Sequence, residues 1–224
     1  MQTISRHPFF CMLTLLVLLA GVQKGYAQNV YKEQKLRTFS GGFVAGANFS
    51  TIDDHDFIHY TKIGANLGGI GFMRFSYRTD LSVEVLFSQK GRNTSTFTGT
   101  NKPGLDFIKM YDRLNYIEVP VMINYIDAIK DHFGVGLSYG RLMNYSEKYV
   151  TDRNLTVHPS PKYVFNQDDI ELLAGAEVHL YKNIYLTVRY QYSLLRIRQE
   201  GFGGFTSPGQ HNNLWALRIV YLFN

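Results

Sequence analysis

Hydrophobic and polar residues alternate with a period of two through most of the chain after residue 38. Eight segments show this alternation, at residues 39–50, 62–75, 81–90, 114–125, 132–144, 169–180, 184–194 and 211–224. A period of two is the pattern of a β-strand with one apolar face. Each segment is about as long as a tilted strand must be to cross a membrane. The pattern therefore predicts an all-β protein.

The last segment is the most informative. Its apolar face consists of Trp215, Leu217, Ile219, Tyr221 and Phe223, and Arg218 is at the centre of the opposite face. An amphipathic aromatic strand at this place is typical of an outer-membrane barrel whose last strand pairs with its first. We expect Trp215, Tyr221 and Phe223 to close the barrel and to lie in the aromatic belt of the membrane.

The connections between the segments alternate in length. The long ones are residues 51–61, 91–113, 145–168 and 195–210, and the short ones are 76–80, 126–131 and 181–183. A membrane barrel with both termini in the periplasm has short turns inside and long loops outside. The sequence thus predicts an eight-stranded antiparallel transmembrane up-and-down β-barrel. A soluble β-barrel or sandwich is the alternative, although it does not need this strict alternation.

The first residues have the features of a secretory signal. Arg6 is followed by an apolar run over residues 9–20, and Gly25 and Ala27 form a small-x-small cleavage site. We expect residues 1–27 to be a cleaved signal peptide, 28–38 a short periplasmic segment and 39–224 an outer-membrane barrel domain. Cys11 is the only cysteine and lies in the signal, so the exported domain would have no disulfides.

Charge and composition narrow the range of partners. Loss of Arg6 and Lys24 with the signal would lower the net charge from +5 to +3, because residues 1–27 contain no acid. This charge is too small for the electrostatic footprint of a nucleic-acid-binding protein, and no nucleic acid is expected. The 16 Tyr and 16 Phe residues are sufficient for aromatic belts at both membrane interfaces. The expected partners are outer-membrane lipid, the barrel-assembly machinery during biogenesis, and an envelope protein that contacts the loops.

The polar faces of the segments carry charges that would be costly in lipid. We expect these to point inward as a lumen polar network, which consists of Glu84, Glu118, Glu171, Glu177, His179, Arg189 and Arg218. The lumen of an eight-stranded barrel is only wide enough to be filled by side chains. The network is therefore interpreted as a polar plug and not as an open pore.

Several residues have catalytic or metal-binding alternatives. His179 beside Glu177 is a candidate base or metal ligand, but a hydrogen-bonded lumen histidine is the favoured interpretation, because no second histidine recurs at ligand spacing. His55 and His59 lie near acidic residues in the first outer loop, which is also the composition of a solvated loop. The serine, histidine and acid that a lipid-modifying enzyme would need occur in or beside the loops, as Ser50, Ser95, His55, His158 and Asp152. No spacing brings them together, so we expect no catalytic site, no metal and no cofactor.

Glycine and proline mark two irregular places in the strands. The apolar phase changes after Gly68-Gly69, which predicts a bulge or a glycine kink there. Pro120 lies within a strand although it has no ladder donor, which predicts a bulge or a carbonyl group left for a lumen partner. The glycine-rich segment 201–205 is interpreted as the tip of an outer loop.

The segment Asn115-Tyr-Ile-Glu-Val-Pro-Val-Met-Ile-Asn-Tyr125 resembles the Y-x-E-x-P strand of the PorT-like outer-membrane β-barrel proteins of Bacteroidetes. Residues 42–50, 84–91, 134–140 and 221–223 also resemble that family. The resemblance covers nearly all of the exported chain and implies an outer-membrane barrel that shares the arrangement around Pro120. The namesake of the family is needed for type IX protein secretion, and most members have no assigned activity.

These observations favour a non-enzymatic envelope protein that acts through its extracellular loops, either as a structural component or as a docking partner. A link to type IX secretion is a narrower hypothesis. The candidate loop anchors are Tyr111, Tyr145, Tyr149, Tyr163, Phe165, Phe202 and Phe205. A lipid-modifying barrel enzyme and a narrow channel for small solutes are the alternatives.

Overall fold

The computed structural model describes residues 38–53, 60–97, 107–129, 131–151, 156–157, 164–198 and 209–223. All regular elements in these ranges are β-strands. They are β1 (Phe39–Asp53), β2 (Lys62–Ser76), β3 (Thr79–Phe97), β4 (Phe107–Ile126), β5 (His132–Thr151), β6 (Thr156–Val157), β7 (Asp168–Tyr181), β8 (Ile184–Ser193) and β9 (His211–Leu222). Within the described ranges, no helix has the length and apolar character needed to cross a membrane.

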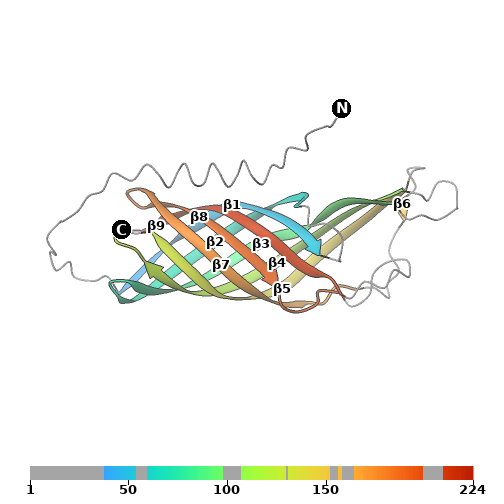
Figure 1. The fold of residues 1–224 in the computed structure, drawn as a ribbon. Helices are drawn as coiled ribbons and strands as arrows, with labels where there is room; N and C mark the ends of the chain where they lie inside the picture. The colour runs from blue at the N-terminus through green and yellow to red at the C-terminus, as the bar shows by residue number, and fades with distance from the viewer. Residues whose placement is uncertain are drawn as a thin grey trace, which may run out of the picture. The chain divides into compact units, whose positions relative to one another are not determined.

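Eight of the strands form a closed antiparallel barrel (Figure 1). Each pairs with its neighbour in the order β1, β2, β3, β4, β5, β7, β8 and β9, and β9 pairs with β1 from Leu222↔Gly42 to His211↔Asp53. The short β6 lies beside the end of β5. The predicted eight-stranded barrel is thus confirmed, and β6 is an addition that the hydrophobic pattern did not indicate.

The barrel is apolar outside and polar inside. On β5, for example, Phe133, Val135 and Leu137 are more than half exposed, while Ser138 is buried. A soluble barrel would place its large apolar side chains in the core. The opposite arrangement is the one that a membrane barrel requires, because its outer surface faces lipid.

Three strands are longer than the sequence pattern predicted. β3, β4 and β5 contain 19, 20 and 20 residues, and they run past the other strands (Figure 1). The predicted loops at residues 91–113 and 145–168 therefore begin and end in strand conformation. The prediction was wrong there because a strand that extends beyond the lipid needs no apolar face, and so shows no hydrophobic alternation.

The predicted bulge at Gly68-Gly69 is absent. The pairing with β1 continues without a shift through Val44↔Gly68, Phe43↔Gly69 and Gly42↔Ile70. The apolar phase changes because Ile70 points inward, where it packs in a buried cluster that also contains Phe72, Leu86 and Val220. The lumen at this level thus holds apolar side chains beside the charged Glu84, which is paired directly with Ile70, and the ladder keeps its register.

Pro120 interrupts one ladder without shifting its register. The pairs of β3 with β4 go directly from Val83↔Val121 to Leu86↔Glu118, so the pairs of Pro120 and of its neighbour Val119 are missing. The bulge in this strand lies elsewhere, between Asn115 and Tyr116, on the side of β5. The absent donor of Pro120 is therefore accommodated by a local gap and not by a bulge at the proline.

Candidate functional site: the polar lumen

The inward positions of the strands hold most of the buried charged side chains in the described part of the chain. Inward and outward positions alternate along each strand, so every second residue of β3, β4, β7, β8 and β9 reaches the lumen. Each of these side chains is costly to bury unless it finds a partner. The partners come partly from the adjacent strand and partly from strands across the lumen.

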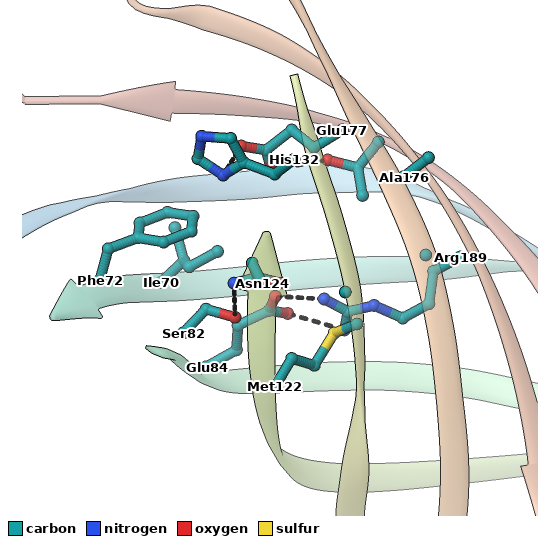
Figure 2. Close-up of a pocket in the computed structure, with 13 residues that line it drawn as sticks. Ile70, Phe72, Ser82, Glu84, Met122, Asn124, His132, Ala176, Glu177 and Arg189 are labelled. Atoms are coloured by element: carbon teal, nitrogen blue, oxygen red, sulfur yellow. Dashed lines mark hydrogen bonds and ion pairs between the residues drawn. The ribbon is translucent and has the colours of Figure 1, made fainter. Parts of the chain in front are cut away.

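The first group, the Glu84 cluster, consists of Glu84, Arg189 and Arg218. Figure 2 shows Glu84 and Arg189. Arg189 donates to Glu84 Oε2 from Nη1 at 3.1 Å and contacts Oε1 through Nη2. Arg218 donates to Glu84 Oε2 from Nη1 at 2.8 Å. All three side chains are at most 3% exposed, so one carboxylate from β3 ties β8 and β9 together inside the barrel.

A small cavity adjoins the Glu84 cluster (Figure 2). Its volume is about 20 Å³, which is room for about one water molecule. His132 Nδ1 lies 3.4 Å from Glu177 Oε1 at its edge, and Thr187 donates to Glu177 Oε2 at 3.1 Å. Asn124 donates to Asp80 Oδ1 at 2.8 Å. The cavity is far too small for a substrate or a cofactor.

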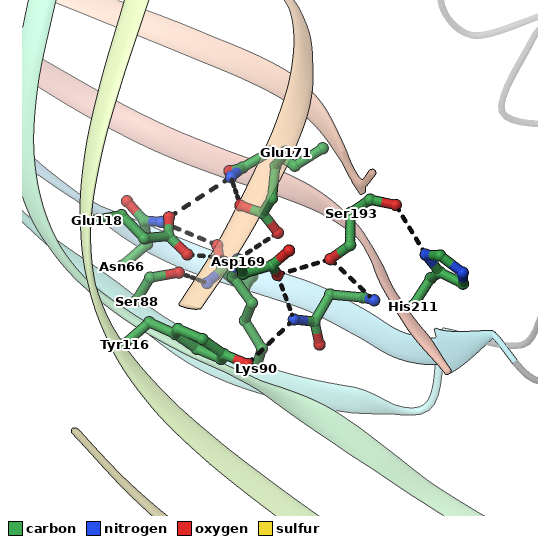
Figure 3. A network of polar contacts seen from close by, with 12 residues as sticks. Asn66, Ser88, Lys90, Tyr116, Glu118, Asp169, Glu171, Ser193 and His211 are labelled. Atoms are coloured by element: carbon green, nitrogen blue, oxygen red, sulfur yellow. Dashed lines mark hydrogen bonds and ion pairs between the residues drawn. The ribbon is translucent and has the colours of Figure 1, made fainter. Parts of the chain in front are cut away.

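The second group, the Lys90 cluster, lies nearer the long-connection end of the barrel (Figure 3). Lys90 Nζ is 2.5 Å from Glu171 Oε1 and also contacts Glu118 Oε1. Gln191 donates to Glu171 Oε2 at 3.0 Å. Lys90, Glu118 and Glu171 have no exposed side-chain surface, so one ammonium group bridges two fully buried carboxylates from β4 and β7.

Asp169 extends this group toward the rim. Ser193 donates to Asp169 Oδ2 at 2.6 Å, and Asn212 donates to the same oxygen at 2.9 Å. Tyr116 lies beneath Lys90, whose Nζ is 5.0 Å from the ring centre. The lumen is therefore crossed at this level by side chains from five strands, β3, β4, β7, β8 and β9.

A third group, the mouth cap, closes the long-connection end. It consists of Phe165, Ile197 and Arg198, which belong to the segments before β7 and after β8. The Arg198 guanidinium lies 3.6 Å from the centre of the Phe165 ring and 2.6 Å from Glu147 Oε1. Phe165 and Ile197 pack in a buried cluster with Ile52, Leu114, Tyr116 and Leu142.

The arrangement has little capacity for chemistry. Its acids and bases are paired with each other and are closed off from solvent. No group of three His, Cys, Asp or Glu side chains among the described residues is arranged to hold a metal ion. Ser50, one of the scattered candidates, is buried and donates to the carbonyl oxygen of Gly91 at 3.0 Å. His55, His59, His158 and Asp152 and the side chain of Ser95 lie outside the described residues.

Six of the seven predicted network residues are buried in the lumen, and His179 is not. His179 is partly exposed at the short-turn end, where its Nε2 lies 2.7 Å from the carbonyl oxygen of Lys182. It differs because the register of β7 with β8 shifts between His179 and Tyr181, at the turn. The glutamates and arginines lie on the regular part of the strands.

The aromatic candidates have different environments. Trp215, Tyr221 and Phe223 are outward-facing and 40%, 49% and 47% exposed. Phe223 packs edge-on against Phe43 of β1, with 5.0 Å between the ring centres, so it lies beside the strand that β9 pairs with. These positions are those of residues at the seam between the first and the last strand.

The candidate loop anchors also differ in their exposure. Tyr111 and Tyr145 lie on β4 and β5 and are 43% and 41% exposed, but Phe165 is buried in the mouth cap. The prediction for Phe165 as an exposed anchor was wrong because its ring is covered by Arg198. Tyr163, Phe202, Phe205 and the side chain of Tyr149 lie outside the described residues.

Lys90, Asp169 and Arg198 were missed as members of the lumen groups. Lys90 is in phase with Glu84 on β3, so the alternation alone placed it on the inward face. Arg198 carried no comparable signal, because it follows the last regular residue of β8.

Residues 26–198 match the family described as outer membrane protein beta-barrel domain. The chain belongs to this family. The match extends over more than two thirds of the sequence, and the apolar exterior and polar lumen of the barrel are those of a transmembrane β-barrel. In outer-membrane barrels of this kind, the short turns lie on the periplasmic side and the long connections are extracellular.

Solved outer-membrane barrels resemble it at low sequence identity. The attachment invasion locus protein Ail of Yersinia pestis is 12% identical, with a TM-score of 0.46, and the match covers 82% of this chain and 98% of that chain. Neisserial surface protein A has 12% identity and a TM-score of 0.37 over 82% and 96% of the two chains. The outer membrane protein AlkL has 13% identity and a TM-score of 0.36 over 88% and 97%. None of the curated proteins compared with the chain matches it significantly.

Proposed function

We propose that this outer-membrane barrel is a closed, non-enzymatic envelope component that docks another envelope molecule through the extracellular ends of its longest strands. The observation that carries the proposal is the lumen, where the Glu84 and Lys90 clusters and the mouth cap occupy successive levels. A pore would need a continuous water-filled path, and the cavity beside the Glu84 cluster has a volume of only about 20 Å³. Activity is therefore assigned to the outer surface.

The surface best suited to docking is the outer extension, defined as residues 92–97 of β3, 107–112 of β4 and 147–151 of β5. Its strands stay paired to Phe97↔Phe107 and Ile108↔Thr151. The neighbouring strands stop earlier, since the pairing of β2 with β3 ends at Asn66↔Ser88. A paired ribbon that projects from a rigid barrel has a backbone held in place by its ladder, which is favourable for binding.

Site-specific photo-crosslinking in cells tests the docking role. A photoactivatable residue in place of Tyr111 is expected to form a protein adduct of discrete mass. Tyr125 is the matched control, because it is on the same strand, is also outward-facing and exposed, and lies at the periplasmic end. The absence of a protein adduct at position 111, or the same adduct at both positions, would contradict the proposal.

Two further measurements test the closed, non-enzymatic character. The purified barrel should show no steady conductance in planar bilayers, and a stable conducting level would favour the narrow channel. Incubation with lipid A or phospholipid should leave the acyl chains unchanged. A modified lipid product would favour the lipid-modifying enzyme instead.

We also propose that the chain belongs to the PorT-like branch from Bacteroidetes, supported by the strand from Asn115 to Tyr125. A role in type IX secretion is the narrower form of this proposal. A deletion strain would then retain type IX cargo inside the cell, and normal secretion would contradict the narrower form while leaving the docking role intact.

Export is the remaining part of the proposal. Residues 1–27 are proposed to be removed, which leaves a chain that begins at Gln28 and engages the barrel-assembly machinery through its closing strand. The intact mass of the protein purified from outer membranes tests this cleavage. A mass that includes residues 1–27 would contradict it.

A further inference from the structure

An open groove lies on the outside of the barrel at its extracellular end, between the end of β8 and the beginning of β7. Its volume is about 530 Å³, and it is lined by Asn166, Gln167, Asp168, Leu194, Leu195 and Arg196. This groove does not belong to the lumen or to the outer extension. Its lining combines two leucines with charged and amide side chains.

The groove begins where the apolar exterior ends. Leu194 continues the outward series of β8 after Tyr190 and Tyr192, and its amide donates to the carbonyl oxygen of Ile170 at 2.7 Å. Asp168 is two residues before Ile170 on β7 and lies on the same outward face, one step closer to the long-connection end. Leu194 and Leu195 are 51% and 44% exposed. The change from apolar to charged residues places the groove at the level of the lipid headgroups in the outer leaflet.

The acid in the groove is already neutralised. Arg141 Nη1 lies 2.7 Å from Asp168 Oδ1, and the Tyr139 hydroxyl donates to the same oxygen at 2.5 Å. The other Arg141 nitrogen, Nη2, donates to Gln167 Oε1 at 2.5 Å. Arg141 and Asp168 thus balance each other, and the charge that remains in the groove is that of Arg196.

Arg196 is exposed, and its guanidinium has no hydrogen-bond or ion-pair partner among the residues that the structure describes. Its aliphatic part lies against Gly209, where an added Cβ would be 2.5 Å from Arg196 Cδ. Gly209 also has a φ of 113°, a backbone conformation that favours glycine. The glycine therefore leaves space for the arginine stem at the edge of the groove.

We propose that this groove binds a phosphate-bearing lipid of the outer leaflet, with the phosphate at Arg196 and an acyl chain along Leu194 and Leu195. A guanidinium group pairs with phosphate oxygens through two parallel hydrogen bonds. The exposed leucines beside it provide an apolar surface for an acyl chain that reaches the headgroup region from the membrane interior. The proposal is independent of the docking role, because it involves no residue of the outer extension.

Native mass spectrometry of the barrel tests the proposal. The barrel is placed in phosphatidylcholine nanodiscs that contain either phosphorylated lipid A or the same lipid A without phosphates, and the retained lipid is counted. The wild-type protein should retain the phosphorylated form. The Arg196→Gln variant should retain about tenfold less, which is the effect of losing one charge-assisted contact. The Leu194→Gln variant should also retain less.

Arg78→Gln is the matched control, since Arg78 is an exposed arginine in the turn between β2 and β3, at the opposite end of the barrel. It should retain as much lipid as the wild type. Equal retention of both lipid A forms by the wild type, full retention by Arg196→Gln, or an equal loss in Arg78→Gln would overturn the proposal. Displacement by inorganic phosphate would also overturn it, because the acyl chain would then contribute nothing.

Discussion

Arg218 of β9 and Glu84 of β3 meet inside the barrel, with Arg218 Nη1 2.8 Å from Glu84 Oε2. They are 134 residues apart in the sequence, and their strands are separated in the sheet by β1 and β2. Both side chains are 1% exposed. The pair therefore links the closing strand to the opposite wall through the lumen, in addition to the hydrogen bonds of the ladder.

Replacing Glu84 by Gln should destabilise the barrel strongly. The variant leaves Arg189 and Arg218 buried without a carboxylate, and removing one partner of a buried ion pair costs about 3–5 kcal/mol. Urea unfolding in lipid vesicles, followed by the fluorescence of the single tryptophan, measures the free energy of unfolding. Asp127→Asn in an exposed turn is the control and should change it by less than about 0.5 kcal/mol. Equal stability of the two variants would contradict the role of the Glu84 cluster.

Replacing Lys90 by Met should also destabilise the barrel, because Glu118 and Glu171 would then face each other without the shared ammonium group. The triple variant Lys90→Met, Glu118→Gln, Glu171→Gln removes both unpaired charges and should recover part of the loss. The same urea titration compares the free energies of unfolding of the two variants, because the effects of substitutions within one network do not simply add. A triple variant less stable than Lys90→Met alone would argue against charge repulsion as the cause.

Gly46→Ala should impair folding, because a Cβ at this inward position would collide with the carbonyl oxygen of Leu217 and with Arg218 across the β1–β9 seam. Gly41→Ala is the control on the same strand, where the nearest atom would be the Ile70 carbonyl oxygen at 3.5 Å. The shift of the folded band on an unheated gel should be lost or reduced for Gly46→Ala only. Normal folding of Gly46→Ala would show that the seam relaxes more easily than the structure implies.

Phe165→Ala should loosen the mouth cap. Loss of a buried phenylalanine costs about 3–5 kcal/mol when the site does not collapse. Hydrogen exchange should become faster at Leu142, Asn166 and Ile197, whose amides bond within or beside this cap. The amide of Ile126, which donates to the carbonyl oxygen of Arg78 at the short-turn end of the barrel, is the internal control. Faster exchange at Ile126 as well would indicate global and not local opening.

Changing Tyr221 and Phe223 to Ser should lower the amount of assembled barrel in the outer membrane, because Phe223 packs on Phe43 at the seam and both residues are exposed on the outside of the barrel. Phe75→Ser is the control. It removes an aromatic residue that is 63% exposed on β2, away from the seam. Fractionation and immunoblotting measure assembly. Normal assembly of the double variant would contradict the importance of the closing aromatic strand.

The number of barrel strands, their antiparallel order and the outward faces could be predicted from the period of two. The extra length of β3, β4 and β5 could not, because residues such as Arg92 to Thr96 are all polar and carry no apolar alternation. The burial of Phe165 could not be predicted from the sequence either, because Arg198, which lies over its ring, is 33 residues further along the chain. Local patterns contain no information about contacts of this kind.

The sequence by itself determined that the chain forms strands with one lipid-facing side, because lipid imposes an apolar residue at every second position of a spanning strand. It also placed Glu84, Lys90, Glu118, Glu171, Arg189 and Arg218 on the inward face. Only the tertiary structure decided which of these charges meet. Their pairing depends on the stagger of eight strands around a closed barrel, and closure joins β1 to β9 at a register that no single strand encodes.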